Sequence, residues 1–262
     1  MPSPDSTLEP LRADPARAAI LCDIDGTLAP IVDDPDAAAV PAETREVLAG
    51  LASRYALVAC VSGRRARAAR RIVGVGSLTY LGNHGLELLE PGEVEPRLDE
   101  ALGHRGSAAA GFVSRLDARE LGGCGLQLED KGPIQAIHWR RAPDPELAEG
   151  RARRLGALAA EQGLVPHFGR MVLELRPVAE IDKGSAVRRL LAPSDLHAAL
   201  FGGDDTTDLD AFAALRELTD AGELEHAVRV AIASPEGPPE LQRQAEVVVD
   251  GPEEFLDLLR GL

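Results

Sequence analysis

A short apolar segment that ends in two carboxylates does most to constrain what this chain can fold into. Ala18–Cys22 is wholly apolar, which predicts a buried strand, and Asp23-Ile24-Asp25-Gly26-Thr27 follows it directly. Side chains two residues apart on a strand point the same way, so Asp23 and Asp25 are expected to bring two like charges together. Such a pair persists only where a cation, a proton or a chemical task compensates for the repulsion.

The rest of the chain predicts an α/β fold. Apolar, strand-like segments alternate with helix-like segments, and the strands are expected at residues 18–22, 55–61, 78–81, 198–201, 227–232 and 245–249. This alternation implies a parallel sheet with right-handed crossovers. The carboxyl ends of such strands meet at one edge, where open α/β sheets bind ligands. Residues 1–15 are expected to form a disordered tail.

The pattern changes in the middle of the chain. Helical spacing is expected from about residue 98 to 121 and again over 145–162. Residues 126–130 and 134–139 alternate apolar and polar side chains around Lys131-Gly132-Pro133, which predicts an antiparallel hairpin with one exposed face. We therefore expect a small α+β module at residues 104–177, inserted into a core domain formed by residues 16–103 and 178–262.

Composition limits the class of protein. The net charge of −15 argues against sequence-independent nucleic-acid binding, although it leaves room for a small anionic substrate. No apolar run is long enough to span a membrane, and the first residues do not resemble a signal peptide. Cys22, Cys60 and Cys124 are expected to be reduced cysteines. We expect a cytoplasmic monomer that binds neither membranes nor nucleic acid.

Four polar clusters lie where predicted strands end or helices begin. At one edge of a parallel sheet they can converge, and together they supply carboxylates, a hydroxyl, an ammonium group and backbone N–H groups. This inventory suits phosphoryl transfer with Mg²⁺, in which a carboxylate can accept the phosphoryl group. Each cluster alone is also typical of a turn or a helix cap. The clusters are Asp23/Asp25/Thr27, Ser62/Arg64, Lys183 and Asp204/Asp205/Asp208.

In this order, the clusters resemble the four motifs of the haloacid dehalogenase superfamily of phosphatases. The resemblance implies a Rossmann-like parallel-sheet core with an inserted α+β cap domain of the C2B type, and Mg²⁺ as cofactor. It implies that Asp23 is the nucleophile that forms an aspartyl-phosphate and that Asp25 is the general acid and base. Ser62 and Lys183 would hold the phosphate. The implied metal ligands are Asp23, the Asp25 backbone carbonyl, Asp204 and either Asp208 or Asp205.

Longer strings are similar to the trehalose-6-phosphate phosphatase family. They include DIDGTLAPI, VSGR, GNHGLE, LEDKG followed by AIHWR, VLELRP, EIDKG and GDDTTDLDAF. This resemblance implies an enzyme of trehalose biosynthesis that hydrolyses trehalose 6-phosphate, a small sugar phosphate. The positions that it implies for substrate binding are Thr27, Gly63, Arg64, Asn83 and His84 in the core and Glu129, Lys131, His138, Arg140 and Glu174 in the cap.

Other functions remain open at this point. A phosphatase of sucrose, glucosylglycerate or mannosylglycerate phosphate shares the same core chemistry and differs in the cap. A phosphomannomutase-like enzyme is disfavoured by the GNHG and cap strings. A receiver-like signalling domain lacks the acid two residues after the acceptor, and a sugar-phosphate-sensing domain with lost chemistry would not retain Asp23, Asp25 and Asp204. The alternation of charged side chains around residues 129–140 is also typical of a solvated sheet face.

Overall fold

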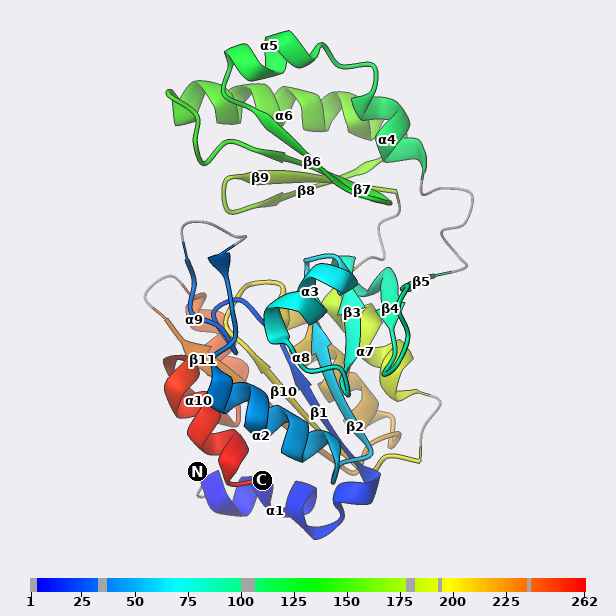
Figure 1. Ribbon diagram of the computed structural model, residues 1–262, viewed down its shortest axis with the longest axis vertical. Coiled ribbons are helices and arrows are strands. Elements are labelled where there is room, and N and C mark those ends of the chain that lie inside the picture. Colours follow the sequence, from blue (N-terminus) through cyan, green and yellow to red (C-terminus); the bar gives the residue numbers. More distant parts are fainter. Residues whose placement is uncertain (1–3, 33–36, 100–106, 178–181, 193–194, 235–236) are drawn as a thin grey trace. The chain divides into compact units, whose positions relative to one another are not determined.

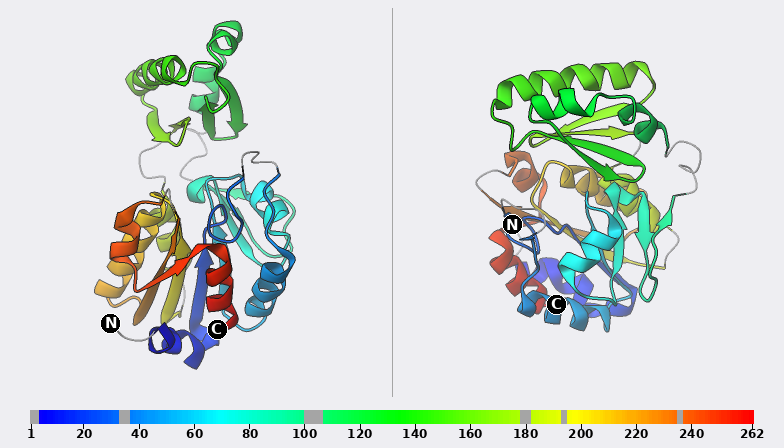
Figure 2. Two further views of the ribbon diagram at one scale, coloured as in Figure 1. Left: turned by 90° about the vertical axis from the view of Figure 1, so that its left-hand side faces the viewer. Right: turned by 45° about the horizontal axis from the view of Figure 1, so that its top comes forward.

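The structure is a computed structural model that describes residues 4–32, 37–99, 107–177, 182–192, 195–234 and 237–262 (Figures 1 and 2). It divides into two compact units: unit 1 comprises Met1–Arg97 and Asp182–Leu262, and unit 2 comprises Leu98–Ile181. The module expected at residues 104–177 has both of its boundaries at residues outside the described ones, 100–106 and 178–181, so those boundaries stay a prediction.

Unit 1 is built on an eight-stranded sheet in the order β12-β11-β10-β1-β2-β3-β4-β5. Its six strands from β12 to β3 are parallel neighbours, as the sequence predicts, whereas β4 runs antiparallel to β3. Cys22, at the end of β1, lies beside Gly202 and Cys60 in the register. The strands are β1 (Ala18–Cys22), β2 (Leu57–Val61), β3 (Thr79–Gly82), β4 (Glu87–Leu89), β5 (Arg97–Leu98), β10 (Ala198–Gly203), β11 (His226–Ala233) and β12 (Val247–Asp250).

Helices cover both faces of this sheet (Figure 2). One face packs against α1 (Pro4–Ala13), α2 (Ala42–Ala52), α3 (Ala66–Val73) and α10 (Gly251–Arg260), and the other against α7 (Lys183–Leu191), α8 (Asp208–Asp220) and α9 (Pro239–Gln244). Ile20 points into the first layer and Leu21 into the second. Because both faces are covered, β1 is buried at every position, which explains its uniform apolar sequence. No helix of the described residues has the length and apolar character needed to cross a membrane.

The prediction that residues 1–15 form a disordered tail is wrong for the described residues 4–15. Residues Pro4–Ala13 form α1, and Pro15–Arg17 form the short 3-10 helix η1. Leu8 and Leu11 are buried in the core of unit 1. Residues three apart lie on the same face of a helix, so α1 can bury both leucines at once. That gain in apolar burial orders a segment that looks polar on average.

Unit 2 is a four-stranded antiparallel sheet with helices on one face (Figure 1). Its strand order is β6-β7-β9-β8, and the hairpin of β6 and β7 turns at Gly132, as the sequence predicts. The expected single helical run from residue 98 to 121 is wrong, because Asp117 caps a new helix by accepting a hydrogen bond from Arg119 N. The elements are α4 (Ser107–Val113), α5 (Ala118–Gly123), β6 (Gln127–Lys131), β7 (Ile134–His138), α6 (Pro145–Glu161), β8 (Val165–Gly169) and β9 (Val172–Arg176).

Candidate active site

Three buried carboxylates meet at the carboxyl edge of the unit 1 sheet. Asp23 follows β1, Asp204 follows β10, and Asp208 begins α8. One carboxylate oxygen from each lies within 4.8 Å of the others. The parallel pairing of β1 with β10 brings the segments together, and Asp23 N donates a hydrogen bond to Gly202 O at 2.9 Å. The arrangement is a set of hard oxygen donors of the kind that divalent cations prefer.

Lys183 is the cationic partner of this cluster. It begins α7, is buried, and places Nζ 2.7 Å from Asp23 Oδ1 and 2.6 Å from Asp208 Oδ1. Burial lowers the pKa of Lys183, but the charges of Asp208 and Asp23 outweigh that effect and raise the pKa above its usual value. The ammonium group is therefore charged at neutral pH.

The cluster carries more negative charge than Lys183 balances. Burial raises the pKa of Asp23 well above its ordinary range, although Lys183 opposes the effect. Burial, followed by the charge of Asp208, raises the pKa of Asp204 to about 7. Carboxylates with raised pKa values favour the binding of either protons or a cation.

Asp208 shapes the loop that carries Asp204. Its Oδ2 accepts hydrogen bonds from Asp204 N and Asp205 N, both at 2.9 Å, while its Oδ1 accepts from Lys183. Asp205 is exposed, and its own carboxylate accepts from Thr206 N. Of the two residues left open by the sequence, the structure brings Asp208 and not Asp205 into the cluster.

Thr27 and Gly26 support Asp204 from the loop after β1. Thr27 is fully buried, and its Oγ1 donates to Asp204 Oδ1 at 3.0 Å. The structure therefore places Thr27, which was expected to bind substrate, against a carboxylate of the cluster. Gly26 has a φ of 87°, and a Cβ there would lie 2.1 Å from Asp204 Oδ2. Only glycine allows this approach.

Asp25 is paired with Arg64 and not with Lys183. Its carboxylate forms two hydrogen bonds with the guanidinium group of Arg64, from Nε and Nη2, each of 2.7 Å. Such paired contacts fix the geometry of both side chains. Asp25 is not a member of the group of three carboxylates found among the described residues. The charges of Asp23 and Asp25 are thus matched separately, by Lys183 and Arg64.

Ser62, Gly63, Asn83 and His84 lie in two joined turns after β2 and β3. Ser62 Oγ accepts from Arg64 N at 3.1 Å. Asn83 and His84, in the 3-10 turn η3 (Asn83–Gly85), have φ values of 50° and 57°. Few residues other than glycine adopt this left-handed conformation, and when they do it is often at functional sites.

The residues expected in the cap form a charged face on the sheet of unit 2. His138 Nε2 lies 2.7 Å from Glu129 Oε2, and this hydrogen bond lowers the pKa of Glu129. Lys131 Nζ donates to Glu174 Oε1 at 2.9 Å. Glu129 and Glu174 both lie beside Ala136 in the sheet register, so they share a face. Arg140 lies apart from these pairs, in the turn after β7, where its side chain is exposed.

Two buried charged residues were missed by the sequence analysis. Arg176, at the end of β9, donates from Nη2 to Glu174 Oε2 at 2.8 Å, so both oxygens of Glu174 are bound by cations. Glu87 begins β4 and accepts from Ala66 N and Asn83 Nδ2. Both lie in strings that resemble the family, VLELRP and GNHGLE. The sequence did offer a signal for both residues. Each is a charged residue that lies within a short apolar strand, next to a candidate site residue.

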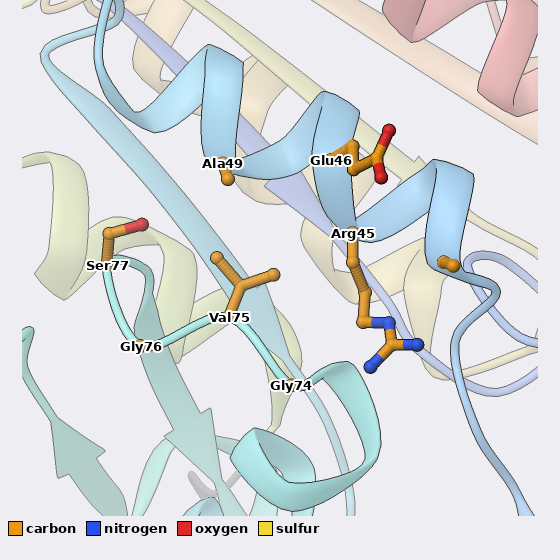
Figure 3. Close-up of a pocket in the computed structure, with 8 residues that line it drawn as sticks. Arg45, Glu46, Ala49, Gly74, Val75, Gly76 and Ser77 are labelled. Carbon is orange, nitrogen blue, oxygen red and sulfur yellow. The ribbon is translucent and has the colours of Figure 1, made fainter.

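A hollow elsewhere on unit 1 is unrelated to these residues. It has a volume of about 510 Å³ and lies between α2 and the segment before β3 (Figure 3). None of the predicted site residues lines it. Its lining consists of Ala42, Arg45, Glu46, Ala49, Gly74, Val75, Gly76 and Ser77.

Comparison with known proteins gives consistent matches. The model of the trehalose-phosphatase family matches residues 21–251. A trehalose-phosphate phosphatase of Mycobacterium avium is 36% identical over 207 residues, which cover 76% of this chain and 51% of that protein. An uncharacterized glycosyl hydrolase of Mycobacterium tuberculosis is also 36% identical, over 218 residues, 76% of this chain and 15% of that protein. The chain thus spans from about one seventh to one half of these relatives' lengths.

The fold is also found in solved structures. The C-terminal domain of Candida albicans trehalose-6-phosphate phosphatase superimposes with a TM-score of 0.75 and 23% identity, covering 98% of this chain and 96% of that chain. A haloacid dehalogenase-like hydrolase from Bacteroides thetaiotaomicron superimposes with a TM-score of 0.61 and 14% identity, covering 93% and 98%. At these identities the likeness establishes the fold.

Proposed function

The chain belongs to the trehalose-phosphatase family, and from this premise we propose that it hydrolyses trehalose 6-phosphate to trehalose and phosphate. The observation that carries the proposal is the buried cluster of Asp23, Asp204 and Asp208 around Lys183. It supplies a nucleophile, a cation-binding set and a phosphate-binding ammonium group at one sheet edge.

We propose Mg²⁺ as the cofactor. Three buried carboxylates, two of them with raised pKa values, fit a small hard cation. Asp23, Asp204 and the backbone carbonyl of Asp25 would hold the ion, and Asp208 would orient Asp204 and Lys183. When bound, the ion offsets negative charge on the phosphate oxygens.

In the first half-reaction, Asp23 attacks phosphorus. A bond forms between its carboxylate oxygen and phosphorus, and the bond from phosphorus to the sugar oxygen breaks. Asp25 gives a proton to the departing sugar oxygen. Ser62 Oγ and Lys183 Nζ bind the phosphate oxygens while the phosphoryl group passes from the sugar oxygen to Asp23.

In the second half-reaction, the ionised Asp25 accepts a proton from water as that water attacks phosphorus. The bond between phosphorus and Asp23 breaks, which returns the carboxylate and releases phosphate. Arg64 would stabilise the ionised form of Asp25 between the two half-reactions, because it binds both carboxylate oxygens.

We propose that the charged face of unit 2 binds the sugar. Trehalose carries many hydroxyl groups and no charge apart from its phosphate. Carboxylate, ammonium and imidazole groups provide suitable hydrogen-bond partners, and a site built for hydroxyls discriminates against sugars that lack them. The sugar ligands proposed on this face are Glu129, Lys131, His138, Arg140 and Glu174. The substrate-binding residues proposed in unit 1 are Gly63, Arg64, Asn83 and His84.

Phosphate release from a panel of sugar phosphates tests the substrate. The panel includes the phosphates of trehalose, sucrose, glucosylglycerate, mannosylglycerate, glucose and mannose. We expect kcat/KM for trehalose 6-phosphate to exceed the others by at least about tenfold. Equal or faster hydrolysis of another member would overturn the assignment, and tight binding of trehalose 6-phosphate without turnover would favour a sensing domain.

We further propose that the protein acts as a monomer in the cytoplasm, without nucleic acid or membranes. Its net charge of −15 supports the exclusion of polyanionic partners. Light scattering coupled to gel filtration should give the mass of one chain, and a dimer mass would contradict the proposal.

A further inference from the structure

The carboxylate of Glu87 lies beside the candidate active site and has no role in the reaction described above. Glu87 is the first residue of β4 and is 1% exposed. It lies opposite Gly82 in the antiparallel pairing of β3 with β4. A buried carboxylate is unfavourable unless it is hydrogen-bonded or paired with a cation. The partners of Glu87 therefore indicate what it does.

One oxygen of Glu87 caps a helix. Its Oε2 accepts from the backbone N of Ala66, the first residue of α3, at 2.7 Å. The N-cap residue of α3 is Arg65, whose side chain makes no capping hydrogen bond. Glu87 supplies the cap from a different element, and its charge is favourable at the positive end of the helix dipole. Arg65 Nε lies 3.4 Å from Glu87 Oε1 and balances part of the charge.

The other oxygen holds the turn that contains Asn83 and His84. Glu87 Oε1 accepts from Asn83 Nδ2 at 3.1 Å. Both residues of the turn have positive φ, which persists only where the surroundings fix it. Asn83 N donates to Arg64 O at 2.7 Å, and His84 N donates to Ser62 O at 3.0 Å. Glu87 thus joins α3, this turn and the loop 62–65.

α3, the turn of Asn83 and His84, and the loop 62–65 are closely packed against one another. A Cβ on Gly82 would lie 2.1 Å from Ala66 N, and a Cβ on Gly63 would lie 2.9 Å from the His84 ring. A displacement at Glu87 is therefore passed on to the loop that carries Ser62 and Arg64. Arg64 in turn holds both oxygens of Asp25.

We propose that Glu87 is a positioning residue of the phosphatase reaction. By holding α3 and Asn83 in place, Glu87 fixes the backbone conformation of the loop 62–64. Arg64, in that loop, in turn fixes the position of the Asp25 carboxylate. The inference rests on the proposed function, because its effect is exerted on the residues that hold phosphate and transfer protons.

The variant Glu87→Gln tests the inference. It keeps the size of the side chain but loses the charge and one acceptor, while Ala66 N and Asn83 Nδ2 both remain donors. We measure kcat and KM well below the unfolding temperature, with trehalose 6-phosphate and with p-nitrophenyl phosphate. We expect kcat to fall by about tenfold or more on both substrates, with KM changed by less than about twofold, since a small misplacement of catalytic groups is enough.

Glu95→Gln is the matched control. It removes an exposed carboxylate, in the segment between β4 and β5, that is paired with Arg67 of α3 at 2.9 Å, and we expect its kcat to equal that of the wild type. A folded Glu87→Gln protein with wild-type kcat would overturn the inference, because Glu87 would then act on stability alone.

If Glu87→Gln does not fold, a second variant tests whether Glu87 acts on the reaction through Asn83. Asn83→Gly removes the amide that Glu87 holds and tolerates the left-handed backbone. With p-nitrophenyl phosphate, which offers no sugar for Asn83 to contact, kcat should also fall by about tenfold. An unchanged kcat would overturn the inference. Failure of the proposed function is distinguishable, because it would show in the wild type as an absence of trehalose 6-phosphate hydrolysis.

Discussion

Replacing Asp204 by asparagine should stabilise the metal-free protein at neutral and alkaline pH. Asp204 is buried, and burial together with the charge of Asp208 raises its pKa to about 7 from an ordinary value of 3.8. The folded protein therefore holds this proton more tightly than the unfolded chain does. Below a pH of about 4 both states are protonated, and as the pH rises to about 7 the folded state loses stability relative to the unfolded state.

The size of the effect follows from the two pKa values. A tenfold difference in proton affinity corresponds to about 1.4 kcal/mol, so ionised Asp204 costs the folded state about 4 kcal/mol. Asparagine avoids this cost and keeps an oxygen that can accept the hydrogen bond from Thr27 Oγ1. At a pH of about 8, Asp204→Asn should therefore raise the free energy of unfolding by roughly 2 to 4 kcal/mol, and at a pH of about 4 the two proteins should be nearly equal.

Urea unfolding in EDTA, followed by far-ultraviolet circular dichroism across this pH range, measures the difference. Trp139 is the single tryptophan and lies in unit 2, so its fluorescence does not follow the unit that contains Asp204. Asp205→Asn is the control, because Asp205 is an exposed neighbour whose charge is the smallest of the causes that shift the pKa of Asp204, so its loss should change stability far less than Asp204→Asn does.

The reasoning would be refuted if Asp204→Asn were no more stable than the wild type at a pH of about 8 in EDTA. Burial and the charge of Asp208 would then not act on this carboxylate. Addition of Mg²⁺ should reverse the order of the two proteins. If Asp204 is one of the metal ligands, as proposed, the wild type gains stability by binding the ion to its folded state, whereas the variant lacks that ligand.

Asp23→Asn should abolish phosphate release, because a carboxamide is a poor nucleophile, while calorimetry still detects trehalose 6-phosphate binding; surviving turnover would contradict the assignment. Gly26→Ala should lower kcat by more than about 100-fold, since its Cβ would displace Asp204, and near-normal kinetics would argue against that constraint. Glu174→Gln should raise KM for trehalose 6-phosphate about tenfold and leave kinetics with p-nitrophenyl phosphate unchanged; equal effects on both substrates would exclude a role in sugar binding.

The parallel sheet was predictable because its central strands are apolar throughout. Helices cover both faces of β1, so all five of its residues are buried and the sequence shows no alternation. The hairpin of β6 and β7 was predictable for the opposite reason. Helices cover one face of its sheet only, so Ile137 faces the core while Glu129 and His138 do not.

Elements that depend on a few distant contacts could not be predicted. α1 buries two leucines, Leu8 and Leu11, against strands far along the chain, and Pro4 and Pro10 make the segment look irregular. The cap that Glu87 provides for α3 is also non-local, because the sequence at the N-terminus of that helix offers arginine where a capping side chain is expected. Neither contact leaves a periodic pattern in the sequence.

Motif order predicted which residues meet at the sheet edge, but not how they are paired. The expectation that Asp23 and Asp25 share one face relied on strand geometry, and β1 ends at Cys22. Asp25 lies in the turn, where it pairs with Arg64, while Asp23 pairs with Lys183 from the opposite half of the chain. The two carboxylates are paired with different cations, since Arg64 binds Asp25 and Lys183 is shared by Asp23 and Asp208. In the proposed reaction Asp23 acts as the nucleophile and Asp25 transfers the proton, and their different partners couple the two carboxylates less tightly than one shared charge environment would.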